Sequence, residues 1–288
     1  MEKEQLLSKG MTTCEGCPME LIARASLEVL GPNTVTMTPP SCSAILTGGG
    51  DETGWGIPSV QTVLASLPAY ASGISEALKI QGKEDVNILG FAGDGGTFDI
   101  GLQALSGAIE RGHKAIFLCY NNEAYMNTGN QRSSATSLGA WTKTTPTGKK
   151  EPGKNIDFML LHQNLDYQAT ASVANIKDLK RKVEKASRQK GPSFIHVHAP
   201  CNTGWKFPAS KTITVAKLAV RSGLWLLWEK ENGRVKLNQR PVDWNLADEY
   251  IRMQGRFDKI TDEVIEQIKT EARNRYNNLL KMEEIECL

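Results

Sequence analysis

Two cysteines close to the start of the sequence, Cys14 and Cys17, form a C-x-x-C pair within MTTCEGCPME at 11–20. A pair with this spacing can bind zinc, act as a redox dithiol, supply half of an iron–sulfur site or form a disulfide bridge. Only six cysteines occur among the 288 residues, which is too sparse for a disulfide scaffold. We therefore expect metal or redox chemistry at this pair first.

A glycine-rich turn, GDGG at 93–96, carries a second chemically informative residue, Asp94. The turn follows the apolar run VNILGFA at 86–92 and precedes FDIGLQALSGAIERG at 98–112, which has the spacing of an amphipathic helix. A bare carboxylate would repel a diphosphate held in such a turn, but a divalent cation between the two converts the repulsion into attraction. The N-terminus of the following helix adds backbone N–H groups suited to an anion.

Further oxygen ligands for such a cation follow the next apolar run, AIFLCY at 115–120, which leads into Asn121 and Asn122. Because the carboxyl ends of neighbouring parallel strands meet at one edge of a sheet, we expect the Asn122 side chain and the Ala124 carbonyl to lie beside the turn. Mg²⁺ prefers oxygen ligands in octahedral geometry. G-D-G followed at this interval by Asn-Asn is a fingerprint for thiamine diphosphate with Mg²⁺, although each half alone is also compatible with a plain turn.

The order of elements favours a parallel α/β sheet, because strand, glycine turn, helix and strand alternate as in a βαβ unit. The sequence predicts further elements as follows: a helix at 19–30, a loop at 40–58, a mostly helical segment at 59–80 interrupted at Pro68, a polar functional loop at 121–155, strands at 167–173 and 193–199 around a basic helix at 175–189, a helix near 214–230 and a charged helical tail at 259–282 that packs on its own domain.

We expect one doubly wound, mostly parallel α/β domain of the type that binds thiamine diphosphate. The prediction divides the chain into an N-terminal segment at 1–58 packed on the main domain, a domain at 59–210 for thiamine diphosphate and Mg²⁺, and a helical C-terminal extension at 211–288. Hydrophobic residues make up 40%, charged residues 23%, and the net charge is +2, so we expect no nucleic-acid or acidic-membrane partner. We found no signal peptide or transmembrane run and therefore expect a cytoplasmic protein.

The chain resembles the thiamine-diphosphate-binding β subunit of the 2-oxoacid:ferredoxin oxidoreductases, and the pyruvate enzymes most closely. The resemblance covers nearly the whole chain and is carried by GDGGTFDIGLQALSGAIERG, YNNEAYMNTGNQRSSATSLGA, APCNTGW and VDWNLADEYIRMQGRF. In that family a C-x-x-C, a third cysteine further on and a fourth before Thr-Gly-Trp hold a 4Fe–4S cluster near the thiamine. The resemblance therefore implies a cluster-binding segment whose ligands are Cys14, Cys17, Cys42 and Cys201.

The resemblance also implies roles for residues around the glycine turn. It places Asp94, Asn122 and the Ala124 carbonyl on Mg²⁺. The three glycines of the turn would approach the diphosphate, and three residues of the next loop would line the cofactor or substrate end, with the alternative that they only order the loop. The glycines are Gly93, Gly95 and Gly96, and the loop residues are Tyr125, Asn127 and Thr128, of which Asn127 and Tyr125 are the candidate catalytic residues.

Partner subunits are implied by a missing part of the catalytic machinery. Thiamine enzymes activate the aminopyrimidine ring with a carboxylate from a second, pyrimidine-binding domain, and this chain contains no such domain. Glu123 lies near the metal end of the cofactor and is a poor candidate. We therefore expect a pyrimidine-binding α subunit to supply the glutamate, γ and δ ferredoxin-like subunits to complete the enzyme, ferredoxin to accept the electrons, and this chain alone to be inactive.

The substrate implied is a small 2-oxoacid of the pyruvate type, with coenzyme A receiving the acyl fragment in the pyruvate enzymes. Several residues depart from the usual pattern, and an alternative is oxalate, from which only CO₂ would form, without coenzyme A. Two further alternatives are a nonoxidative thiamine enzyme with a structural zinc site, and a non-catalytic scaffold subunit. The departing residues are Met11, Pro18, Asn121, Asn130, Ser137 and Leu138.

Four residues outside these motifs have simpler interpretations. Cys119 lies inside an apolar run and is predicted to be a buried core thiol. Cys287 is next to last and is predicted to be exposed. His196 and His198 share one face of a predicted strand, and we expect packed or hydrogen-bonded rings there in preference to a metal site.

Overall fold

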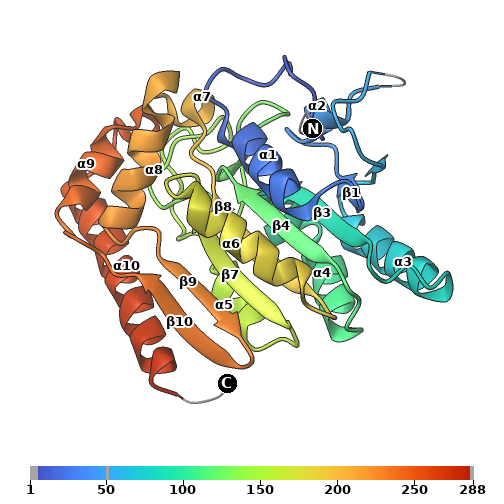
Figure 1. The fold of residues 1–288 in the computed structure, drawn as a ribbon. Coiled ribbons are helices and arrows are strands. Elements are labelled where there is room, and N and C mark those ends of the chain that lie inside the picture. Colours follow the sequence, from blue (N-terminus) through green and yellow to red (C-terminus); the bar gives the residue numbers. More distant parts are fainter. Residues whose placement is uncertain (1–5, 50–51, 286–288) are drawn as a thin grey trace.

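The computed structural model describes residues 6–49 and 52–285, and its centre is an eight-stranded sheet (Figure 1). The strand order is β10-β9-β7-β8-β4-β3-β1-β2. The six strands from β7 to β2 in this order are parallel to their neighbours, whereas β9 and β10 run antiparallel. The strands are β1 (Thr34–Thr38), β2 (Ser59–Gln61), β3 (Asn87–Gly93), β4 (Ile116–Asn121), β7 (Tyr167–Ser172), β8 (Ser193–His198), β9 (Leu227–Glu231) and β10 (Arg234–Gln239). The predicted, mostly parallel α/β fold is confirmed.

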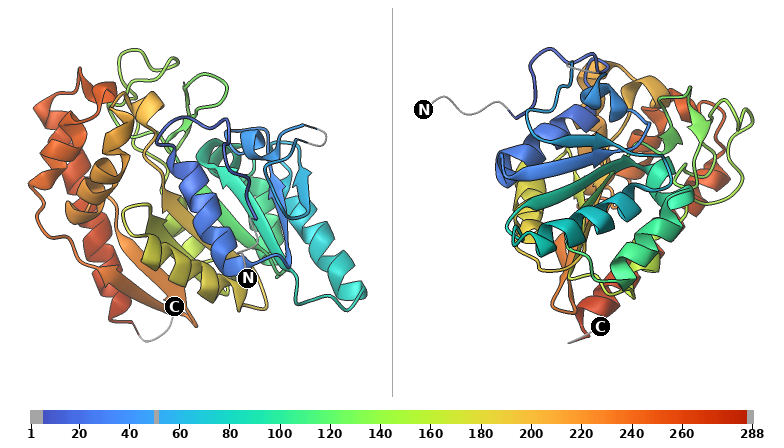
Figure 2. Two further views of the ribbon diagram at one scale, coloured as in Figure 1. Left: turned by 45° about the horizontal axis from the view of Figure 1, so that its top comes forward. Right: turned by 90° about the vertical axis from the view of Figure 1, so that its right-hand side faces the viewer.

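Helices cover both faces of this sheet, which explains why the central strands are continuous apolar runs (Figure 2). On one face, α1 (Pro18–Leu30) and α6 (Ile176–Ser187) pack side by side. On the other face lie α3 (Leu67–Ile80), α4 (Leu102–Glu110) and α5 (Ile156–Leu161). Every residue of β4 is buried between the two layers.

The segments before and after the central βαβ units also contribute strands, which the sequence did not predict. β1 and β2 extend one edge of the sheet, and β9 and β10 extend the other. The helix predicted at 59–80 begins only at Leu67, because 59–61 pair with β1 as β2 and Pro68 occupies the first turn of α3. A prediction of helix for 59–61 was therefore wrong.

The helix predicted near 214–230 is also too long. The structure has α8 (Thr212–Arg221), which ends before Gly223 at a φ of 77°, a conformation that glycine adopts without strain. Residues from Leu227 onward form β9, whose pairing with β7 and β10 overrides the apolar spacing that suggested a helix.

The charged C-terminal tail packs on its own domain, as predicted. It forms α10 (Asp262–Glu283), which follows α9 (Leu246–Arg252). The Thr261 side chain caps its N-terminus by accepting from the Val264 amide. Leu279 of α10 is buried in a cluster with Trp228 of β9 and residues of β10.

A buried carboxylate fastens β9 to the rest of the sheet. Glu229 accepts hydrogen bonds from the Tyr167 hydroxyl at 2.7 Å, the Arg181 guanidinium at 2.9 Å and the Asn238 amide at 2.9 Å. Burial alone would raise the pKa of Glu229, but these donors outweigh it and lower the pKa to about 2.

No helix within the described ranges is both long and apolar enough to cross a membrane.

Candidate functional site

The carboxylate of Asp94 lies fully buried where β3 ends. Its two oxygens accept hydrogen bonds from the backbone amide of Asn122 at 3.3 Å and from the Ser133 hydroxyl. Burial raises the pKa of Asp94 to about 7 despite these bonds. Asp94 makes no ion pair with a lysine, arginine or histidine of the described residues. A buried carboxylate of this kind fits a bound cation.

The neighbouring strand brings Asn122 to the same place, as predicted. Gly93 pairs with Tyr120 in the parallel register of β3 and β4, so the residues that follow both strands lie side by side. The Asn122 side-chain oxygen accepts from the Ala124 amide at 3.3 Å, and its backbone carbonyl accepts from the Trp205 indole at 2.8 Å. Between them Glu123 adopts a φ of 59°, which is uncommon for a residue with a side chain. We call residues 122–124 the metal turn, after the role that the family resemblance predicts for them.

The three glycines of the turn differ in how much room a side chain would have at each position. A Cβ at Gly95 would lie 2.5 Å from the Tyr125 ring, and one at Gly93 would lie 3.2 Å from Tyr120. A Cβ at Gly96 would meet no atom closer than 3.4 Å. The Tyr125 hydroxyl donates to the Gly95 carbonyl at 3.1 Å, so this ring lies directly over the turn. Gly95 is therefore the glycine that close packing requires, and Tyr125 is the side chain that controls access to it.

All four cysteines implied as cluster ligands line one cavity of about 200 Å³, together with Asn122 and Asn127. Three of the four lie at helix N-termini, where backbone N–H groups favour negative charge. Cys17 is the N-cap of α1, Cys201 is the N-cap of the short α7 (Asn202–Trp205), and Cys42 lies just before α2 (Ala44–Thr47). The Cys201 sulfur accepts from the Gly204 amide at 3.3 Å.

These four cysteines are free thiols, and burial opposes the ionisation of three of them, Cys17, Cys42 and Cys201. Burial raises the pKa of Cys42 to about 12 and that of Cys201 to about 11, and nearby thiols add to both shifts. The pKa of Cys17 is also raised, again mainly by burial. Iron centres favour the thiolate form of such ligands, so this donor set fits a metal cluster. Within the part of the chain that the structure describes, no three His, Cys, Asp or Glu side chains are grouped to hold a single metal ion.

The predicted loop residues occupy different places. Asn127 is exposed and lines the cysteine cavity, whereas Thr128 is exposed and hydrogen-bonds with Gln131 at 2.7 Å. This loop forms a small hairpin of β5 (Ala124–Tyr125) and β6 (Gln131–Arg132). The hairpin turns the 121–136 segment back over the Asp94 turn and brings Ser133 to it.

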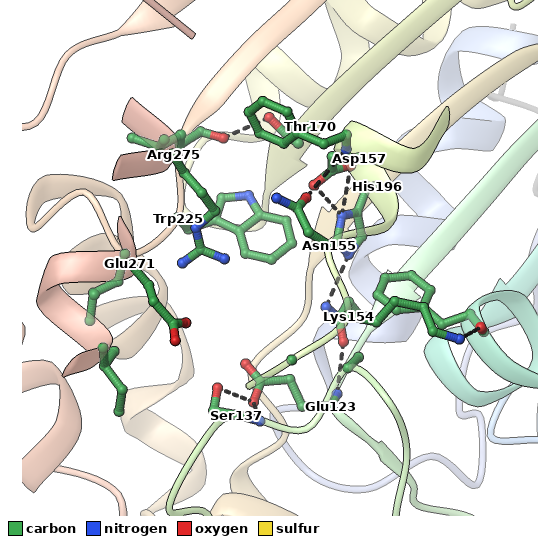
Figure 3. Close-up of a pocket in the computed structure, with 18 of the residues that line it drawn as sticks. Glu123, Ser137, Lys154, Asn155, Asp157, Thr170, His196, Trp225, Glu271 and Arg275 are labelled. Carbon is green, nitrogen blue, oxygen red and sulfur yellow. Dashed lines mark hydrogen bonds and ion pairs between the residues drawn. The ribbon is translucent and has the colours of Figure 1, made fainter. Parts of the chain in front are cut away.

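A second cavity, of about 130 Å³, is lined by Asn121 and Glu123 (Figure 3). A hydrogen-bonded chain runs along its wall: Asp157 contacts His196 Nδ1 at 3.0 Å, and His196 Nε2 contacts the Asn121 amide at 3.0 Å. The Asn121 oxygen then accepts from the Glu123 amide at 2.9 Å. His198 also hydrogen-bonds, to the Tyr250 hydroxyl at 3.3 Å, so both histidines are packed and bonded as predicted.

Three of the residues that depart from the family pattern, Asn121, Ser137 and Leu138, line this second cavity and not the cysteine cavity. The fourth loop departure, Asn130, has its amide 3.5 Å from the Gly204 carbonyl. Cys119 is buried, and burial raises its pKa, in agreement with a core thiol. The prediction for Cys287 falls outside the described residues.

The sequence interpretation missed three residues that hold the site together. Ser133 bonds Asp94, Trp205 bonds the Asn122 carbonyl, and Arg256 donates to the Glu123 carboxylate at 2.8 Å. Glu123 also accepts from the Ser137 amide and hydroxyl, at 3.0 and 2.7 Å. Trp205 and Arg256 lie in APCNTGW and VDWNLADEYIRMQGRF, two stretches that carry the family resemblance, but no spacing links either residue to the Asn122–Glu123 turn.

Comparison with known proteins agrees with this geometry. Residues 51–197 match the family described as thiamine pyrophosphate enzyme, C-terminal TPP binding domain. The chain is 45% identical to pyruvate synthase subunit PorB of Methanothermobacter thermautotrophicus, over 91% of this chain and 92% of that one. It is 41% identical to ketoisovalerate oxidoreductase subunit VorB of Pyrococcus horikoshii, over 98% and 94% of the two chains.

Among solved structures, a 2-oxoglutarate:ferredoxin oxidoreductase from Magnetococcus marinus superposes with a TM-score of 0.62. It shares 19% identity, covering 88% of this chain and 92% of that one, so it supports the fold alone. The family match covers residues 51–197, and the two subunit relatives cover nearly the whole sequence. The chain belongs to the thiamine-pyrophosphate-binding β subunits of the 2-oxoacid:ferredoxin oxidoreductases.

Proposed function

We propose that this subunit binds thiamine diphosphate with Mg²⁺ beside a 4Fe–4S cluster, and that its enzyme passes electrons from a small 2-oxoacid of the pyruvate type to ferredoxin. The observation that carries the proposal is the cavity shared by the four cysteines and Asn122. The same asparagine hydrogen-bonds to Asp94 through its backbone amide. The cysteine cavity and the Asp94 turn therefore adjoin each other, which supports a redox centre close to the bound cofactor.

The metal turn supplies the expected Mg²⁺ ligands. Asp94 would provide a carboxylate oxygen, Asn122 a side-chain oxygen and Ala124 its backbone carbonyl. At present Asp94 is held by Ser133 and Asn122 by the Ala124 amide, so a bound cation would compete with these hydrogen bonds. The diphosphate would face Gly93, Gly95 and Gly96. The Tyr125 ring, which lies over this turn, would either stay beside the diphosphate or move aside.

The cysteine cavity favours a cluster over a single zinc ion. Among the described residues no three His, Cys, Asp or Glu side chains are close enough together to hold one metal ion, whereas all four cysteines share a cavity of about 200 Å³. Cys14, Cys17, Cys42 and Cys201 would be the four thiolate ligands. Iron content and broad absorption near 400 nm in the purified protein support the cluster, whereas a colourless, zinc-loaded protein contradicts it.

Bound thiamine diphosphate supplies a nucleophilic carbon for the keto group and an electron sink while CO₂ leaves, and a nearby cluster offers a one-electron exit. The protein's own contribution is to bind, orient and shield. Asn127 lines the cysteine cavity and would hydrogen-bond a substrate oxygen there, and the Tyr125 hydroxyl bonds the Gly95 carbonyl of the glycine turn. We assign both as catalytic candidates, with Thr128 at the outer end of the same loop.

The activating glutamate is expected from a partner α subunit. Glu123, the carboxylate in the metal turn, is already committed to Arg256 and Ser137 and cannot serve the aminopyrimidine. The relatives are named as subunits, which agrees with an enzyme of several chains. Purified 1–288 alone should show no 2-oxoacid-dependent viologen reduction, and robust turnover would overturn this expectation.

The substrate is tested on the complete complex. Anaerobically reconstituted enzyme is assayed for viologen reduction with pyruvate, 2-oxobutyrate, 2-oxoglutarate and oxalate, each with and without coenzyme A. We expect the highest kcat/KM with pyruvate, and a requirement for coenzyme A. Reduction with oxalate alone, independent of coenzyme A, would replace the pyruvate assignment by oxalate, and no reduction with any oxoacid would contradict the proposed function.

A further inference from the structure

The indole of Trp205 joins the two halves of the candidate site. Trp205 ends α7, the short helix that Cys201 caps, and its backbone amide donates to the Cys201 carbonyl at 2.8 Å. Its indole N–H donates to the Asn122 carbonyl, also at 2.8 Å. Trp205 is only 1% exposed. One rigid side chain therefore spans the space between a predicted cluster ligand and a predicted Mg²⁺ ligand.

The guanidinium of Arg256 lies over the ring of this indole. Its guanidinium carbon lies 3.7 Å from the centre of the Trp205 ring, and its Nη1 donates to Glu123 at 2.8 Å. Gln254 accepts from Arg256 Nε at 2.9 Å, which fixes the plane of the guanidinium. Stacking on an aromatic ring while pairing with a carboxylate is a combination that arginine makes and lysine does not.

The contacts fix the conformation of the metal turn. The Asn122 carbonyl belongs to the peptide that leads into Glu123, which has the uncommon positive φ. That peptide is held at its oxygen by Trp205 and at its nitrogen by the Asn121 side chain, while the Glu123 carboxylate is held by Arg256. Rotation of this peptide would redirect the Asn122 side chain and the Ala124 carbonyl, the two ligands the turn is expected to give.

We propose that Trp205 is a positioning residue that fastens the metal turn to the Cys201 segment and keeps the turn in its cation-binding conformation. This inference rests on the proposed function. It assigns no contact between Trp205 and a reacting atom; the indole acts through the Asn122 carbonyl. Loss of the indole N–H should let the turn sample conformations that cannot bind Mg²⁺, and apparent affinity falls in proportion to the competent fraction.

The test is Trp205→Phe in the full complex, because phenylalanine keeps an aromatic ring under Arg256 and removes the N–H donor together with part of the indole, a loss of ring size that the control variant shares. The matched control is Trp225→Phe, since the Trp225 indole also donates to a backbone carbonyl, but to that of Ala171, at 2.9 Å, and not to that of Asn122. Binding of thiamine diphosphate is measured by calorimetry across a series of Mg²⁺ concentrations. Melting temperature is recorded for each variant.

We expect W205F to bind thiamine diphosphate about tenfold more weakly and to need more Mg²⁺ for half-saturation, while W225F binds as the wild type does. A general structural role would lower both melting temperatures without separating the two affinities. Equal affinities for W205F, W225F and wild type would overturn the inference. Wild-type protein that fails to bind thiamine diphosphate at all would instead overturn the proposed function.

A second variant decides the matter if W205F does not assemble. Arg256→Lys keeps a positive charge beside Glu123 but removes the flat group that lies on the Trp205 ring. A loss of affinity of threefold or more in R256K supports the inference. Affinity within twofold of the wild type overturns it.

Discussion

The buried ion pair between Glu123 and Arg256 offers the sharpest test of how the metal turn is held. Their side chains are 9% and 3% exposed and lie 2.8 Å apart. Glu123→Gln preserves the shape of the side chain and an oxygen for the Ser137 hydroxyl, but it leaves the guanidinium without its counter-charge. Removing one member of a buried pair strands the other charge away from water.

The expected cost follows from this burial. Breaking a buried pair by removing one partner typically costs about 3 to 5 kcal/mol. Because the glutamine oxygen can still accept hydrogen bonds from Arg256 and Ser137, we expect the lower end, about 3 kcal/mol. For a chain of this size each kcal/mol shifts the melting temperature by roughly 2–4 °C, so E123Q should melt about 6–12 °C lower.

The free energy of unfolding is measured by urea denaturation followed by far-ultraviolet circular dichroism. Glu184→Gln is the matched control, because Glu184 pairs with Arg188 on the surface, where the side chains are 51% and 71% exposed. Its cost should stay below about 0.5 kcal/mol. Removing both charges with E123Q/R256M should recover part of the loss and give a coupling of at least about 2 kcal/mol. Equal costs for E123Q and E184Q, or a coupling below about 1 kcal/mol, would refute the reasoning.

Three further variants test other parts of the structure. The folded-state pKa of Glu229 is lowered to about 2, below its value of 4.5 in an unfolded chain. Its stabilisation of up to about 3 kcal/mol is therefore present above pH 4.5 and is lost as the pH falls toward 2. Glu229→Gln should remove this acid-dependent part of the free energy of unfolding in urea, and an unchanged pH profile would contradict it. Cys201→Ser should lose iron and the absorption near 400 nm, whereas Cys119→Ser, away from the cavity, should keep both; equal iron in the two variants would contradict the ligand assignment. Gly95→Ala would place a methyl group 2.5 Å from the Tyr125 ring, so thiamine diphosphate should bind at least tenfold more weakly by calorimetry, with partial recovery in G95A/Y125A, and unchanged binding in G95A would contradict the tight packing.

Two anticipated residues of the site, Asp94 and Asn122, share one property: each lies directly after an apolar strand. Asp94 follows β3 and Asn122 follows β4, and parallel pairing of two neighbouring strands leaves little freedom in where these residues lie. A short motif on each strand was therefore sufficient. The fold class followed from the same alternation of apolar runs and helices.

The parts it missed depend on pairing and packing across long separations. β9 was assigned to a helix because its apolar spacing is ambiguous, and only its antiparallel pairing with β7 settles it. Arg256 donates to Glu123 across 133 positions of sequence, and its guanidinium is buried against the Trp205 ring. No local spacing encodes such a contact. The same holds for Ser137, whose hydroxyl donates to Glu123 and which does not line the cysteine cavity.

The sheet order explains why the cysteine cavity and the metal turn adjoin. In the order β8-β4-β3-β1, the segments after the four strands carry Cys201, Asn122, Asp94 and Cys42 respectively. Neighbouring strands lie about 4.8 Å apart, so β8 and β1 are separated by about 14 Å, too far for two cysteines at the strand ends to share one cluster. Both cysteines lie beyond the ends of their strands, on loops that bend inward over β3 and β4. The central strands β3 and β4 lead into Asp94 and Asn122, whereas the loops after β1 and β8 carry Cys42 and Cys201. A change in the length of either loop would therefore move a cysteine without disturbing Asp94 and Asn122.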